Sequence, residues 1–143
     1  MRKRFVVAPV LLTIGLLTAC NTGEVVSEHE YEEFKDTIYA EDFTGFAYLL
    51  VSHITHEGGH IEEIEKVFNE TNNQLHYSNT QNYDQETFEQ LDEDTRNQEF
   101  PLPSDSIVYI NNGEEVERFD IENDVIKTAE YQQALQSFIE NRQ

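Results

Sequence analysis

The stretch FAYLLVS-HITHEGGH-IEEIEKVF, residues 46–68, decides the fold of this chain. Its first part, Phe46 to Val51, is continuously apolar and rich in residues that favour strands, which predicts a central strand buried on both faces. A polar loop with two glycines follows. Apolar residues then recur at helical spacing with acidic residues opposite them, which predicts an amphipathic helix over residues 61–71.

Working outward, the chain carries further helical and strand patterns on both sides of this stretch. Before it, residues 31–43 have a helical pattern. After it we expect a polar strand, an exposed helix, a β-hairpin turning at an Asn-Gly pair and a C-terminal amphipathic helix; these lie at 74–80, 84–98, 106–119 and 131–139. The order strand, helix, strand, helix, hairpin, helix predicts a single α/β domain, with a central sheet flanked by helices.

This order of elements resembles the thioredoxin fold over residues 46–142. The resemblance also rests on Pro101-Leu102-Pro103 before the hairpin and on Asn112-Gly113 within it. In that family a cis-proline precedes the hairpin and faces the active-site loop, which makes Pro103 the candidate for that role. Thioredoxin-like folds hold extended peptides beside this proline, so the resemblance implies a peptide-binding loop at Pro103.

The expected active-site loop departs from the family's pattern. Where thioredoxins carry Cys-x-x-Cys, residues 54–60 read Ile-Thr-His-Glu-Gly-Gly-His. Thiol–disulfide exchange requires a thiolate nucleophile, and the only cysteine of the chain is Cys20. We therefore expect a thioredoxin-like domain without redox activity.

The N-terminus has the pattern of a bacterial lipoprotein signal. Three basic residues precede an apolar segment that is too short to span a membrane as a helix, and the segment ends in Leu17-Thr18-Ala19-Cys20. This ending resembles a lipobox, whose cysteine is acylated before cleavage. We expect residues 1–19 to be a signal peptide, Cys20 to carry lipid, 20–30 to be a tether and 31–143 to be the domain, on the extracytoplasmic face of the cell membrane.

Charge and cysteine content exclude several classes of function. Removing the three basic signal residues leaves six Lys and Arg against 29 Asp and Glu, a net charge of −23. Nucleic acid and anionic lipid headgroups would both be repelled by such a chain, although an acidic surface also suits proteins of salty or alkaline habitats. Once Cys20 is acylated, the domain has no thiol for a disulfide, a nucleophile or a metal site.

A second hypothesis comes from the loop itself, because His56 to His60 matches the zinc-protease motif H-E-x-x-H. That mechanism needs a helix, so that both histidines face one ion while Glu57 acts as base. Two intervening glycines oppose the helix by about 2 kcal/mol. A third ligand would have to come from a distant carboxylate such as Glu70, Glu86 or Glu89.

A weaker form of this hypothesis is a metal site without hydrolysis. His53, His56 and His60 lie within eight residues and suit Zn²⁺, Cu²⁺ or Ni²⁺. The simpler interpretation is three exposed loop histidines. We expect no cofactor, and a protein that binds a protein or peptide partner at the membrane surface; metal binding or zinc peptidase activity is the alternative.

Overall fold

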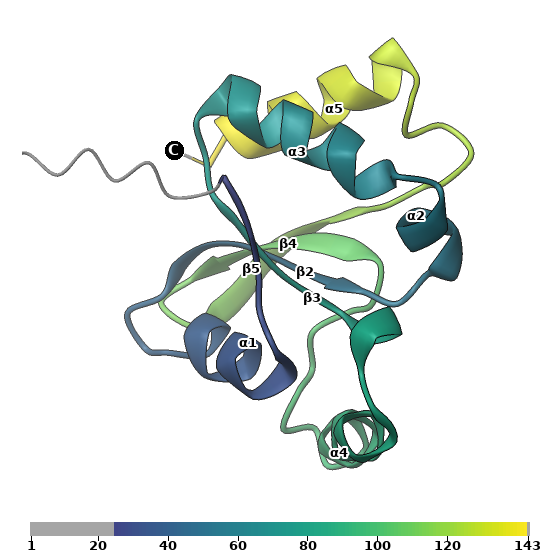
Figure 1. Ribbon diagram of the computed structural model, residues 1–143. Coiled ribbons are helices and arrows are strands. Elements are labelled where there is room, and N and C mark those ends of the chain that lie inside the picture. The colour runs from purple at the N-terminus through teal and green to yellow at the C-terminus, as the bar shows by residue number, and fades with distance from the viewer. Residues whose placement is uncertain (1–24, 143) are drawn as a thin grey trace, which may run out of the picture.

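A five-stranded sheet forms the middle layer of the structure (Figure 1), a computed structural model that describes residues 25–142. The strands are β1 (Val26–Glu28), β2 (Thr44–Leu50), β3 (Leu75–Asn79), β4 (Ser106–Asn111) and β5 (Glu114–Asp120). Their order in the sheet is β1-β3-β2-β4-β5. The first three strands are parallel, whereas β4 is antiparallel to β2 and β5 is antiparallel to β4.

Helices cover both faces of this sheet. They are α1 (Tyr31–Ile38), α2 (His53–Glu57), α3 (His60–Thr71), α4 (Gln85–Arg96) and α5 (Ala129–Glu140), with a 3-10 turn at Thr80–Asn82. Figure 1 shows α3 and α5 side by side on one face, with α1 and α4 on the other. The expected mixed α/β architecture, with a sheet between helices, is confirmed.

β2 is the central strand, and its side chains alternate between the two cores. Phe46, Tyr48 and Leu50 pack under α3 and α5, while Ala47 and Leu49 pack under α1 and α4. All five side chains are buried. Because successive residues of a strand point to opposite faces, a strand covered by helices on both sides must be apolar throughout, as the sequence predicted.

The predicted helix over residues 61–71 and the C-terminal helix are both confirmed. Ile64 and Phe68 of α3 and Leu135 and Phe138 of α5 belong to one core cluster with Phe46. The two helices therefore pack against each other as well as against the sheet.

The Asn-Gly hairpin is also confirmed. Asn112 and Gly113 connect β4 to β5 with positive φ values of 52° and 74°, as a tight hairpin turn requires. A Cβ atom on Gly113 would lie 2.9 Å from the carbonyl oxygen of Ala40. The glycine thus serves both the turn and the close approach of the loop after α1.

Two boundaries differ from the expectation. Residues 26–28, expected in the tether, form β1 and pair with β3; a three-residue strand has too little pattern to be recognised alone. The helix expected over 31–43 ends at Ile38, and residues 39–43 turn back toward β2. The predicted signal peptide and Cys20 lie outside the described residues, and no helix within 25–142 is long and apolar enough to cross a membrane.

Candidate functional site

The loop between β2 and α3 contains the histidines that the sequence singled out, and two glycines divide it. α2 ends at Glu57 and is capped by Gly58, while Gly59 has a left-handed backbone with φ of 66°. α3 then begins at His60 in a new direction. The helix that the H-E-x-x-H mechanism requires is therefore interrupted between its two histidines.

Each of the three histidines has a different environment. His56 accepts a hydrogen bond at Nδ1 from the Asn79 amide at 2.9 Å, and the buried His60 donates from Nδ1 to Asn123 Oδ1, also at 2.9 Å. His53 is exposed. Within residues 25–142, no three His, Cys, Asp or Glu side chains gather in a geometry that could hold a metal ion. The structure does not bring the candidate ligands together.

A hydroxyl and amide network lies at the end of β2 instead. Ser52 caps the N-terminus of α2 and accepts a hydrogen bond from the amide of Thr55, which is fully buried. Asn123, in the loop after β5, accepts from Thr55 Oγ1 at 2.6 Å and donates to Ser52 Oγ at 3.3 Å. Asn123 thereby joins the first turn of α2 to His60 at the start of α3.

Asp105 holds the same strand end from the other side. Its carboxylate accepts hydrogen bonds from the backbone amides of Val51 and Ser52 at 3.0 and 2.9 Å. Its own amide donates to the carbonyl of Leu49 at 2.9 Å. Asp105 has a positive φ of 50°, a conformation that Asp tolerates better than most residues. The turn before β4 is thus fastened to the β2–α2 junction.

Pro103 lies close to this turn, but the peptide bonds of the described chain are all trans. Pro103, the candidate for the family's cis-proline, therefore has a trans peptide bond in this structure. The backbone approach to β2 is made by Ser104, which forms an isolated parallel bridge with Leu49, and by Asp105. Ser104 and Asp105, neither of which is a proline, reverse the direction of the chain before β4.

An apolar groove opens beside Pro103, between the turn and α4. Its lining combines the end of β2, the turn and one face of α4: Leu49, Val51, Phe88, Leu91, Asp92, Thr95, Leu102 and Ser104. The groove has a volume of about 330 Å³. Phe88 is 48% exposed, although an aromatic side chain gains free energy when it is removed from water. We call these residues the α4 groove.

The solvent side of α4 is acidic. Glu86, Glu89 and Glu93 are exposed, and in the described chain none of them forms an ion pair with a Lys or Arg. The Asp92 carboxylate at the groove does pair with Arg96, at 2.8 Å. Asp92 is the only carboxylate in the lining of the α4 groove, and helical spacing places Glu86, Glu89 and Glu93 on the other side of the helix.

A buried polar cluster fixes α4 in place. Asp94 accepts hydrogen bonds from Tyr31 and Lys35 of α1, both at 2.6 Å. The bond from Lys35, followed by that from Tyr31, lowers the pKa of the Asp94 carboxyl, and burial raises the pKa of the Tyr31 hydroxyl. This cluster ties the helix that forms one wall of the α4 groove to α1.

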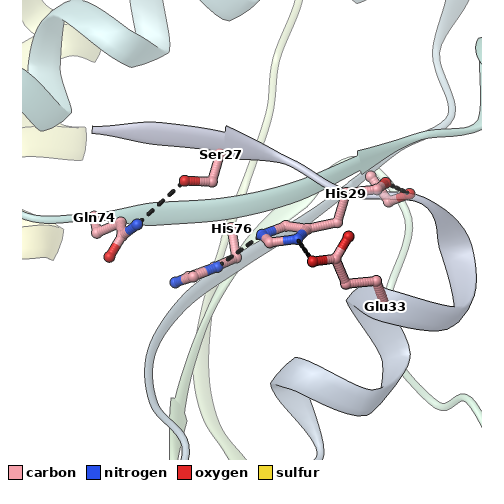
Figure 2. Close-up of polar contacts among 6 residues, drawn as sticks. Ser27, His29, Glu33, Gln74 and His76 are labelled. Carbon is pink, nitrogen blue, oxygen red and sulfur yellow. Dashed lines mark hydrogen bonds and ion pairs between the residues drawn. The ribbon is translucent and has the colours of Figure 1, made fainter. Parts of the chain in front are cut away.

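Two further histidines lie next to each other at the β1 edge of the sheet (Figure 2). His29 Nε2 and His76 Nδ1 are 2.9 Å apart in a hydrogen bond, and the rings stack with centroids 5.1 Å apart. On its other side, His29 Nδ1 lies 3.5 Å from a Glu33 carboxylate oxygen. Burial, and then the neighbouring His29, lower the pKa of His76. The pair links β1 to β3.

Comparison with known proteins adds no relative: no family model, no curated protein and no solved structure matches this chain.

Sequence reasoning missed the residues that shape the end of β2. Ser52 carried a usable signal, because a serine directly after an apolar strand is a preferred N-cap residue. Asp105 and Asn123 carried none, since each acts on a segment more than 50 residues away in the sequence. The α4 groove depends on the docking of α4, whose sequence shows only two apolar residues, Phe88 and Leu91.

Proposed function

We propose that this chain is a bacterial lipoprotein whose thioredoxin-like domain has no redox chemistry and binds a segment of another protein at the extracytoplasmic face of the cell membrane. The arrangement after Thr44 supports the thioredoxin-like interpretation. The chain runs in order through the buried strand β2, the helical segment of α2 and α3, the parallel strand β3, the helix α4, the hairpin of β4 and β5, and the closing helix α5. All of these strands belong to one sheet, and the hairpin strand β4 lies next to β2.

The loss of redox chemistry has a structural counterpart at the end of β2. Ser52 and Thr55, three residues apart in the first turn after this strand, occupy the place where the family's Cys-x-x-Cys pair is expected. The proposal therefore assigns these positions to 52 and 55, in place of the expected 54–60. Hydroxyl groups do not undergo thiol–disulfide exchange, and Thr55 is held in a hydrogen bond to Asn123.

The α4 groove is the observation that carries the proposed binding function. It is apolar, lies beside Pro103, and contains an aromatic side chain that is half exposed. Such exposed apolar surface, rimmed by polar residues, is typical of interaction sites. The overall negative charge of the chain favours a basic occupant through long-range attraction: an extended peptide segment with one apolar side chain flanked by Lys or Arg.

Binding is tested with the full chain in detergent and two sets of peptides, in which a Leu or Phe is flanked by Lys and Arg or by Glu. We expect the basic set to bind and the acidic set not to bind. Phe88→Ala is expected to weaken binding by at least about tenfold, as for other aromatic contact residues. Val116→Ala is the matched control, because Val116 is 59% exposed on the distant strand β5.

Equal binding of the two peptide sets would contradict the charge selection. Equal losses in the Phe88 and Val116 variants would contradict the assignment of the site. Release of product from any peptide by the pure protein would instead favour an enzyme.

Location is tested by Cys20→Ala. We expect the wild-type chain to fractionate with membranes and to incorporate labelled fatty acid, because the acyl chains supply the anchor. The variant is expected to lose both properties. A variant that remains with the membrane, unprocessed and unchanged, would rule out lipid anchoring through Cys20.

A further inference from the structure

The described chain begins at one particular end of the sheet. Val25 accepts a hydrogen bond from the amide of Leu75 at 2.8 Å, and Ser27 accepts one from the side chain of Gln74 at 3.1 Å. β1, β2 and β3 are parallel, so all three start at this end. Figure 1 shows β1 starting beside the end of α5 and the connection from α3 to β3. We call this end of the sheet, which includes Val25, Thr44 and Gln74, the entry end.

The α4 groove lies at the opposite end of the sheet. β2 runs from Thr44 at the entry end to Leu50 beside the groove, and seven residues of strand cover about 23 Å. The two surfaces are therefore separated by the height of the sheet.

One part of the entry end differs in chemistry from the acidic surface around it. A depression of about 180 Å³ lies there, lined by Thr44, Gly45, Phe46, Asn73, Gln74, His76, Tyr109 and Arg142. This lining contains no carboxylate, in a chain with 29 Asp and Glu residues. Its cation, Arg142, packs over the Phe138 ring and forms an ion pair with Glu117, which neutralises the nearest acidic side chain of β5.

The chain between the proposed anchor and the domain is short. The five steps from Cys20 to Val25 can span at most about 18 Å, even if fully extended. A domain of this size has a diameter on the order of 35 Å. An anchor at Cys20 therefore cannot reach around the domain and allow the groove end to lie on the bilayer.

We infer that the entry end is a membrane-facing surface, and that the bilayer carrying the anchor is its partner. This inference rests on the proposed acylation of Cys20. Tether length carries this orientation, because exposed carboxylates such as Glu70, Glu114 and Glu140 also lie at the entry end, and an anionic membrane surface repels carboxylates within a Debye length of about 8 Å. The carboxylate-free depression is the surface that such a membrane tolerates best. The α4 groove then points away from the membrane, toward partners outside.

The orientation is measured with single-cysteine probes, which this chain allows because Cys20 is its only cysteine. We choose Gln74→Cys and Asn141→Cys at the entry end, and His53→Cys and Ile54→Cys at the groove end; all four positions are exposed. Each full-length acylated protein is labelled with a fluorophore. It is then reconstituted in vesicles of phosphatidylethanolamine and phosphatidylglycerol that contain a lipid with a nitroxide on its headgroup.

We expect the nitroxide to quench the probes at 74 and 141 several-fold more strongly than those at 53 and 54. A matched control lengthens the tether with a Gly-Ser segment after Asn21, which is expected to reduce the difference. Equal or reversed quenching in protein that floats with the vesicles would overturn the orientation and leave the anchor intact. Protein that lacks acyl mass and does not float would overturn the anchor proposal, and the orientation with it.

Discussion

Replacing Gly59 by Ala distinguishes two interpretations of the His56–His60 segment, because they predict opposite changes in the free energy of unfolding. In the structure Gly59 has φ of 66°, a region that costs residues with a Cβ about 1–2 kcal/mol. Gly59→Ala should therefore destabilise the fold by about 1–2 kcal/mol, measured by urea unfolding. In a continuous zinc-protease helix the same change would stabilise it by about 0.8–1 kcal/mol.

Gly59→Asn is the matched control, because Asn tolerates the left-handed region better than Ala. We expect its free energy of unfolding to lie between those of the wild type and Gly59→Ala. A stabilising Gly59→Ala, together with a near-stoichiometric metal ion in the purified protein, would reinstate the metal hypothesis for His53, His56 and His60.

His76 gives the protein a pH dependence whose sign follows from its environment. Burial and the adjacent His29 lower the pKa of His76 from its usual 6.5. Above pH 6.5 His76 is neutral in both states and its contribution is complete. As the pH falls below this value, the unfolded chain binds the proton first, so stability decreases until the folded-state pKa is passed.

We expect His76→Gln to remove part of the stability loss between pH 7 and pH 5.5, measured by urea unfolding at each pH. Glu33 and His29 are the titratable groups closest to this site, so Glu33→Gln is measured alongside to separate the carboxylate's part. His53→Gln alters an exposed side chain and should leave the wild-type slope unchanged. An identical slope in His76→Gln would show that the pair does not titrate in this range.

Among the helices and strands, α4 is held by the hydrogen bonds of Asp94 as well as by the apolar packing of Leu91. Only Leu91 and Asp94 of this helix are buried. Asp94→Ala would leave Tyr31 and the partly exposed Lys35 without their shared acceptor, and should cost about 2 kcal/mol. Because α4 forms a wall of the groove, the affinity for basic peptides should fall in the same variant.

Asp92→Ala provides the matched control on the same helix. Its ion pair with Arg96 is exposed on both sides, and such pairs contribute no more than about 1 kcal/mol. If the two variants lost equal stability, the buried cluster would not be what holds α4 to α1.

Periodicity predicted the elements whose own residues form a strong apolar pattern. β2, α3 and α5 were predicted because an apolar strand or an amphipathic helix records its own burial in its sequence. β1 and α4 were weak or missed, since a three-residue strand and a helix with two apolar residues are stabilised by β3 and by Asp94 respectively. Such stabilisation from other parts of the chain leaves little local signal.

For the whole molecule, the formal net charge of −20 sets the response to salt. Unpaired carboxylates repel one another in the compact state. Raising the ionic strength from about 0.01 M to about 0.15 M shortens the Debye length from about 30 Å to about 8 Å. We therefore expect the free energy of unfolding to rise with potassium chloride over this range.

A variant with Glu86, Glu89 and Glu93 changed to Gln reduces the negative charge on one exposed face. It should be more stable than the wild type at low salt and respond less to added salt. Stability that is independent of salt in the wild type would show that the carboxylates are too far apart, or too well solvated, to affect folding.

Local patterns in the amino-acid sequence were sufficient to predict the mixed α/β class, the central strand, the two core helices and the hairpin. The sequence also shows that no thiol is present beyond Cys20. These features follow from local pattern and composition, which do not depend on how distant segments meet.

Which side chains share a site depends on how distant segments pack, and could not be predicted from the sequence. The histidines of the loop are close in sequence. Gly59 nevertheless turns the chain, so that His56 forms a hydrogen bond with Asn79 and His60 forms one with Asn123. The α4 groove and the turn at Asp105 join β2 to segments about 40 to 55 residues further along the chain. Such contacts depend on the packing of whole helices against the sheet, and no local spacing in the sequence records them.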